Sequence, residues 1–176
     1  MSTLAVDRAT NLAGTAFYNL MDFDTVKSAT GTVVDFTGIP SWVKRVTVMF
    51  NGVSTNGASN SLVQLGTSVG ITTTGYTSTS AATNNSGGGT TSSTAGYVMR
   101  APGAAGALIG HMTITIVSGN TWVSSHVADV QASGVVDFGG GTVTLAAVLT
   151  TVRITSVTPD TFDAGSINLI YEGYNV

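Results

Sequence analysis

The chain has no cysteine among its 176 residues. This absence excludes disulfide bonds, thiolate metal sites and cysteine nucleophiles together. Charge is also scarce, because Asp, Glu, Lys and Arg make up 9% of the residues, against about 25% in an average soluble domain. The six Lys and Arg residues are scattered along the chain, so no basic stripe is available to neutralise a phosphate backbone. We therefore expect no nucleic-acid partner.

Long hydrophobic runs are missing as well. The mean hydropathy of +0.34 is high, but apolar runs such as LAAVL at 145–149 are far shorter than the roughly 18 residues that a membrane-spanning helix needs. Disordered chains combine low hydrophobicity with high net charge, whereas 43% of these residues are hydrophobic and the net charge is −3. The composition predicts a folded domain without membrane insertion.

Most of the chain alternates apolar and polar residues, the period of a half-buried strand. The clearest case is VKRVTVMF at 43–50, in which Val46, Val48 and Phe50 share one face. Further strands are predicted at 31–36, 61–66, 111–117, 121–127, 142–149, 151–157 and 166–172, and turns between them at NGVSTNG (51–57), FGGGT (138–142) and TPDTFDAG (158–165). Many short strands without helical periods indicate an all-β fold, an antiparallel jelly-roll-like β-sandwich.

The two ends of the chain differ in pattern. Residues 30–176 carry the strand signals and are predicted to form the β-sandwich domain. Residues 1–29 form an N-terminal arm or attachment segment, for which helical turns, a first strand and an extended arm remain open. The Ser-, Thr- and Gly-rich stretch at 77–96 predicts a long exposed loop or a flexible hairpin tip.

The segment SGNTWVSSH at 118–126 contains one of two tryptophans and one of two histidines. Gly119 and Asn120 suit the turn of a two-residue hairpin. Counting back from this turn pairs Val117 with Trp122 and places Trp122 and His126 on the more polar face. Trp122 is then either a cross-strand aromatic that packs against neighbouring residues or a ligand-binding platform, with His126 beside it as a second candidate ligand-binding residue.

Catalytic motifs are not found in the sequence. GVSTNG at 52–57 is one residue too long for a hydrolase nucleophile elbow, and no serine is marked out to join His126 and Asp129 in a triad. No spacing selects a glycosidase pair among the carboxylates, which include Asp129, Asp137, Asp160, Asp163 and Glu172. We expect no enzyme, no catalytic residue and no cofactor.

One metal hypothesis comes from PDTFDAGSIN at 159–168. Asp160 and Asp163 lie three residues apart there, and their oxygens would suit a hard cation such as calcium. The alternative is an Asx-type turn that leads into the last strand.

Three stretches together resemble a known kind of domain: VDFTGIPSWVKRVTVMFNGVSTNGASNSLVQLG (34–66), VSGNTWVSSH (117–126) and LTTVRITSVTPDTFDAGSINLIYEG (149–173). They are similar to a carboxy-terminal β-domain of bacteriophage tail-fibre and other virion-associated structural proteins. That family has no catalytic motif to transfer. The resemblance implies localisation at the exterior of a virion, a homotrimer, and contacts with other virion proteins or with a host-surface glycan or receptor.

The residues themselves also predict self-association. Because charged side chains are so few, the surface must include apolar area that a soluble monomer would not expose. The predicted strands also have few Lys, Glu or Pro residues to block edge pairing. A homo-oligomer covers both, and the trimer is what the resemblance adds. Two alternatives to host binding remain: a capsid-decorating or head-fibre protein that binds the virion shell, and a glycan-modifying enzyme.

Overall fold

The computed structural model describes residues 9–10, 16–100, 106–131, 134–158 and 160–175. Their secondary structure is two antiparallel β-sheets, and none of these residues lies in a helix that could cross a membrane. In spatial order the larger sheet contains β1 (Ala9–Thr10), β2 (Ala16–Phe23), β15 (Phe162–Asn175), β5 (Val43–Thr55), β11 (Ala107–Ser118), β12 (Thr121–Gln131), β13 (Val135–Thr144), β8 (Thr77–Asn84) and β9 (Gly87–Ser93), with β3 (Lys27–Ser28) also on β15. The smaller sheet contains β10 (Tyr97–Met99), β6 (Ser61–Thr67), β14 (Thr151–Ser156) and β4 (Val34–Thr37), with β7 (Gly70–Ile71) on β6.

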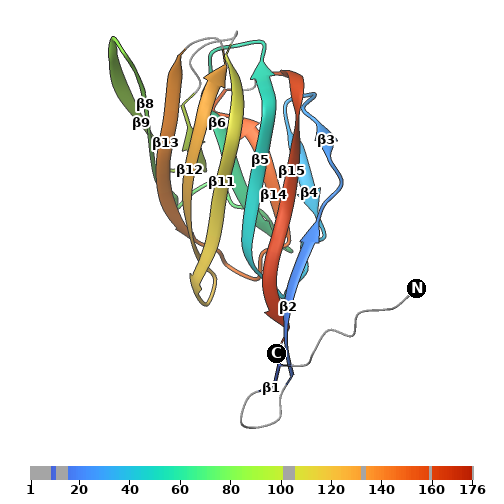
Figure 1. The fold of residues 1–176 in the computed structure, drawn as a ribbon. Coiled ribbons are helices and arrows are strands. Elements are labelled where there is room, and N and C mark those ends of the chain that lie inside the picture. Colours follow the sequence, from blue (N-terminus) through green and yellow to red (C-terminus); the bar gives the residue numbers. More distant parts are fainter. Residues whose placement is uncertain (1–8, 11–15, 101–105, 132–133, 159, 176) are drawn as a thin grey trace, which may run out of the picture.

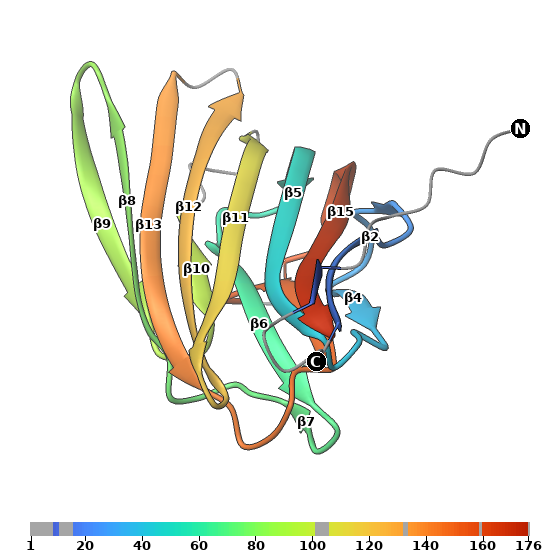
Figure 2. The same ribbon diagram turned by 60° about the horizontal axis from the view of Figure 1, so that its bottom comes forward.

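The strand order is that of a jelly roll. Eight strands in chain order are β2, β4, β5, β6, β10, β11, β14 and β15, and they form the layers β2-β15-β5-β11 and β4-β14-β6-β10. The first, eighth, third and sixth strands thus share one sheet, as two Greek keys require. Two inserted hairpins, β8–β9 and β12–β13, extend the larger sheet beyond β11 (Figures 1 and 2). The predicted antiparallel sandwich is confirmed.

The core lies between the two sheets. Val46, Val48 and Phe50 are buried, as the alternation in VKRVTVMF predicts. Tyr76 and Tyr97 meet edge to face with ring centroids 5.1 Å apart, and the Tyr76 hydroxyl accepts a hydrogen bond from the Leu65 N–H at 2.7 Å. Burial raises the pKa of Tyr76 to about 12 and also raises the pKa of Tyr97, so both rings stay neutral in the core.

Two predicted turns are wrong. NGVSTNG continues β5 as far as Thr55, and FGGGT lies inside β13. The glycines of β13 serve close packing instead: a Cβ on Gly139 would lie 2.4 Å from the Thr79 carbonyl oxygen and 2.7 Å from His126 Cε1. Glycine runs also mark turns, so the sequence alone could not separate the two uses.

Two uncertain segments turn out to be strands. The stretch at 77–96 forms the hairpin of β8 and β9 rather than a long loop, with Asn85 and Ser86 between the strands. Within the predicted N-terminal arm, β2 and β3 both pair with β15, so the first-strand alternative holds for Ala16–Phe23. Residues 1–8 and 11–15 lie outside the described residues. The sandwich therefore includes residues that the sequence assigned to the arm.

The hairpin of β11 and β12 turns where the sequence predicts. Gly119 has a φ of +54°, and Ser118 lies opposite Thr121. The register beyond this pair is different, because a bulge at Val117 makes Ile116 the partner of Trp122 and Met112 the partner of His126. The extra residue turns every later side chain of the predicted pairing to the other face.

We expect Gly119→Val to lower the free energy of unfolding by about 1 kcal/mol or more, because a β-branched residue does not adopt a positive φ cheaply. No atom lies within 4 Å of a Cβ built at this position, so the cost is conformational rather than a clash. Gly119→Asn is the matched control, since asparagine tolerates this conformation better. Chemical denaturation of the three proteins measures the difference, and equal midpoints for valine and asparagine would contradict the assigned turn.

Candidate functional site

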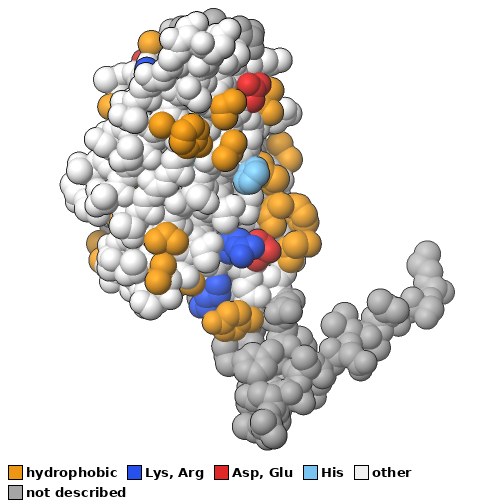
Figure 3. Space-filling view, turned by 60° about the vertical axis from the view of Figure 1, so that its left-hand side comes forward, with side chains coloured by type: hydrophobic (Ala, Val, Ile, Leu, Met, Phe, Trp, Pro, Cys, Tyr) orange, Lys and Arg blue, Asp and Glu red, His pale blue; other side chains and the backbone are white. Residues whose placement is uncertain are grey.

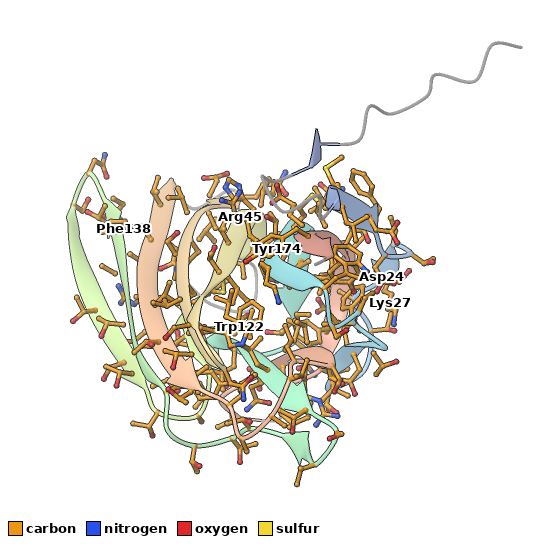
Figure 4. All side chains as sticks on the ribbon, turned by 90° about the horizontal axis from the view of Figure 1, so that it is seen from below. Asp24, Lys27, Arg45, Trp122, Phe138 and Tyr174 are labelled. Carbon is orange, nitrogen blue, oxygen red and sulfur yellow. The ribbon has the colours of Figure 1, made fainter. Side chains whose placement is uncertain are left out.

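Trp122 and His126 lie inside the sandwich, contrary to the predicted register. Trp122 is 2% exposed and His126 is 4% exposed, and Figure 4 shows Trp122 between the two sheets. The bulge at Val117 is the physical reason, because it turns Trp122 and His126 inward and Val123 and Val127 outward. Neither candidate ligand-binding residue is accessible to a glycan, so Trp122 is a core residue.

His126 belongs to a buried polar network. Its Nε2 lies 3.1 Å from Asp137 Oδ2, and the Ser80 hydroxyl donates to Asp137 Oδ1. The backbone N–H of Arg100 donates to Asp137 Oδ2 at 3.1 Å. Asp137 is 0% exposed. The carboxylate stands between the serine and the histidine, whereas a hydrolytic triad needs the histidine in the middle, so the network suits structure rather than nucleophilic catalysis.

The sequence paired His126 with the wrong aspartate. Asp129 is exposed on the opposite face of β12, so it does not meet the buried imidazole. The true partner, Asp137, lies on β13, where His126 is opposite Gly139. That glycine leaves room for the imidazole. It is the one sequence signal for the site, and the glycine run around it predicts a turn instead.

Asp160 and Asp163 serve two separate contacts. Asp160 Oδ2 accepts a hydrogen bond from the Ser59 N–H at 2.8 Å, and Asp163 Oδ1 accepts one from the Ser54 hydroxyl at 2.5 Å. Within the part of the chain that the structure describes, no three His, Asp or Glu side chains are grouped to hold a metal ion. The geometry gives the calcium hypothesis no ligand set.

The outer face of the larger sheet, the side turned away from the smaller sheet, is an accessible surface that extends across the strands from β15 to β8. Cross-strand pairing places residues in rows along it. One row from β15 to β8 contains Asn168, Met49, His111, Val127, Phe138 and Ala81, and the next contains Ser166, Asn51, Ile109, Asp129, Val136 and Thr83. Uncharged side chains dominate both rows.

Two groups of exposed apolar side chains lie on this face, and Val123 lies on it outside both. The first, here the β13 cluster, consists of Ile109, Val127, Val136 and Phe138; Phe138 is 46% exposed. The second, here the β2 cluster, consists of Met21, Phe23 and Tyr174 at the other flank; Met21 is 66% exposed. Figure 3 shows hydrophobic side chains in separate groups with few charges between them. Apolar groups of this kind on a folded domain mark protein contacts.

The charges near the two clusters differ in sign. Beside the β13 cluster, the exposed carboxylate of Asp129 has no ion-pair partner among the described residues. Beside the β2 cluster, Lys44 Nζ lies 5.8 Å from the centroid of the Tyr174 ring. Arg45 Nη1 and Glu172 Oε2 form an ion pair at 3.4 Å, so their charges offset each other. Arg45 and Tyr174 are labelled in Figure 4. On the outer face, the β13 cluster is thus bordered by the Asp129 carboxylate and the β2 cluster by the Lys44 ammonium group, whereas the exposed Asp22 lies on the other face of β2.

A hollow of about 410 Å³ adjoins the β2 cluster. The aliphatic side chains of Leu20 and Met21 form one part of its wall, and Thr115 forms another. The lining also includes Lys44, Arg45, Glu172 and Gly173. An aromatic or branched apolar side chain of another molecule could pack against the apolar wall of this hollow, close to the Lys44 ammonium group.

A second depression, of about 460 Å³, lies along the β8–β9 hairpin. Thr83, Asn84 and Ser86 line it with hydroxyl and amide groups, opposite Val135. Arg100 also lines it and holds the hairpin, because its Nη1 donates to the Gly89 carbonyl oxygen at 3.1 Å. The depression therefore offers neutral hydrogen-bonding groups and a guanidinium group, which suit a hydroxyl-rich ligand such as a glycan.

Comparison with known proteins assigns no family. No protein-family model matches the chain, and no curated protein matches it significantly. The two clusters and the hairpin depression are accessible to other molecules, whereas the polar groups of the buried network are not.

Proposed function

We propose that the chain is a non-enzymatic structural domain at the exterior of a bacteriophage particle, a fibre or appendage domain that assembles as a homotrimer and contacts the host surface. The observation that carries the proposal is the outer face of the larger sheet, which exposes apolar clusters where a free-standing monomer would place charges. The sequence resemblance to fibre domains supplies the virion setting. Repetition of one weak site around a trimer would raise avidity without a deep pocket.

The host contact is assigned to the depression along the β8–β9 hairpin. It takes over the role that the sequence gave to Trp122, because Asn84 and Ser86 are exposed and lie in this depression. Each hydrogen bond from such groups contributes about 0.5–1.5 kcal/mol to binding. A host-surface glycan is the ligand class that these groups fit.

The test is binding of the fluorescently labelled protein to susceptible and resistant bacteria and to purified phage shells. We expect it to coat susceptible cells and to spare resistant ones. The double variant Asn84→Ala with Ser86→Ala should bind susceptible cells about tenfold more weakly, since two hydrogen bonds are lost. The exposed loop pair Thr73→Ala with Thr74→Ala, which lines neither depression, is the matched control.

Three results would count against the proposal in different ways. Stoichiometric binding to shells without binding to cells would replace the host contact by capsid decoration. Equal cell binding by both double variants would move the contact away from the hairpin. Release of reducing ends from host polysaccharide would make the protein an enzyme.

A further inference from the structure

We infer that the subunits join head to tail, with the β13 cluster of one copy seated on the β2 cluster and its hollow in the next copy. The inference rests on the proposed self-association and specifies its interface. It assigns Phe138 as the side chain that enters the hollow and a second copy of this chain as the occupant of both clusters.

The placement of the two clusters is the first argument. Both lie on one face of one sheet, so they cannot meet within a single molecule. Thr47, Thr113 and Ser125 form a row across the strands between them. The phenyl ring of Phe138 projects from one flank, and the hollow on the other flank has an apolar wall, so the two shapes are complementary. Stable interfaces are often centred on an aromatic side chain that fills a pocket in this way.

Charge is the second argument, and it selects head-to-tail contact over contact between identical surfaces. Pairing two β13 clusters would bring Asp129 toward a second Asp129, and pairing two β2 clusters would bring Lys44 toward a second Lys44. Like charges that face each other in an interface are destabilising. Joining the two different clusters brings Asp129 toward Lys44, each of which has no ion-pair partner in the described residues.

Symmetry is the third argument. A heterologous contact either closes into a ring or continues as a filament. Both halves of the contact lie on the same sheet face, so a face-to-face dimer about a two-fold axis would also place each β13 cluster on the β2 cluster of the other copy. A ring of three copies with the outer faces inside is the arrangement that agrees with the fibre resemblance, and a wild-type mass of three rather than two times the 17.8 kDa chain distinguishes it.

The test uses one variant in each cluster. Phe138→Asp disables the β13 cluster and Met21→Asp disables the β2 cluster, and both side chains are exposed, so the fold should survive. We expect each variant alone to sediment as a monomer at micromolar concentration. Mixed in equal amounts, they should form a heterodimer of about twice the 17.8 kDa chain, because one intact contact remains between them. Val157→Asp, an equally exposed valine outside both clusters, is the control and should stay oligomeric.

A charge exchange gives an independent readout. Asp129→Lys and Lys44→Asp should each weaken assembly at least tenfold, and the double variant that exchanges both charges in one chain should recover it. Melting curves and tryptophan emission verify that every variant is folded.

The outcomes separate the interface from the proposed function. Monomers alone in the mixture of Phe138→Asp and Met21→Asp would indicate contact between identical surfaces and overturn the inference. A persistent oligomer for only one single variant would indicate contact between two copies of the unmutated cluster, and persistent oligomers for both would place the interface elsewhere; either result would overturn the inference. A wild-type protein that is monomeric at micromolar concentration would remove the proposed self-association itself.

Discussion

Trp122→Ala is expected to lower the free energy of unfolding by about 3–5 kcal/mol, the usual range for removing a buried tryptophan. The indole is 2% exposed on β12, between Ile116 of β11 and Val143 of β13. Its removal would leave a cavity in a core where packing is close. Urea denaturation at fixed protein concentration measures the change, because the stability of an oligomer depends on concentration.

Two further variants make this result specific. Trp122→Phe should cost much less than Trp122→Ala, because the ring is retained and the indole Nε1 has no hydrogen-bond partner among the described residues. Thr121→Ala is the neighbouring control at a position that is not in the core. If Trp122→Ala kept its full stability and instead lost cell binding, the residue would be a surface platform and the bulge at Val117 would be wrong.

Most strands could be predicted because their signal is local, whereas the predicted strand at 142–149 is wrong beyond Thr144, where β13 ends. Alternation in VKRVTVMF places Val46, Val48 and Phe50 on one face, and the structure buries all three. Gly119 was likewise predictable, because a positive φ in a tight turn favours glycine. Each of these inferences needs only residues within a few positions of one another.

The register of the hairpin could not be predicted, because a bulge has no reliable sequence signature. One extra residue at Val117 changes the partner of Trp122 from Val117 to Ile116. Since side chains alternate with a period of two, that single residue exchanges the core face and the outer face. The predicted site therefore lay on the wrong face, and the β13 cluster, which contains Val127, could not be predicted for the same reason.

The pairing of strands far apart in the chain could not be predicted from the sequence either. The last strand, β15, lies between β2 and β5, so residues from both ends of the chain form the β2 cluster. Tyr174 and Met21 are more than a hundred residues apart, and no local pattern relates them. The β2 cluster depends on this closure of the sheet, which explains why composition predicted self-association without indicating that surface.

The buried network connects the core to the proposed interface. Asp137 and Phe138 are neighbours on β13, and alternation points the carboxylate inward and the phenyl ring outward. The contacts of Asp137 with His126 of β12 and with the Arg100 backbone fix the position of β13 relative to these neighbours. The position of Phe138 on the outer face follows from that anchor.

Asp137→Ala is therefore expected to lower the free energy of unfolding by about 3 kcal/mol or more, because each buried polar group that loses its hydrogen-bond partner costs about 1–3 kcal/mol. The substitution leaves the Ser80 hydroxyl and His126 Nε2 without this partner in a site closed to water, and the Arg100 N–H keeps only its bond of 3.2 Å to the Ser80 hydroxyl oxygen. Asp163→Ala is the matched control, since that carboxylate is exposed and accepts a hydrogen bond from the Ser54 hydroxyl. Its cost should stay near 1 kcal/mol or below.

A double-mutant cycle with His126→Ala tests whether the two residues act together. Because Asp137 and His126 share a hydrogen bond at 3.1 Å, the double variant should be more stable than the sum of the single losses predicts, by about 0.5–3 kcal/mol. Assembly should weaken together with stability in Asp137→Ala, since β13 then holds Phe138 less firmly. Strictly additive losses would show that the imidazole and the carboxylate contribute separately, and full assembly by a destabilised Asp137→Ala protein would show that this anchor does not position the β13 cluster.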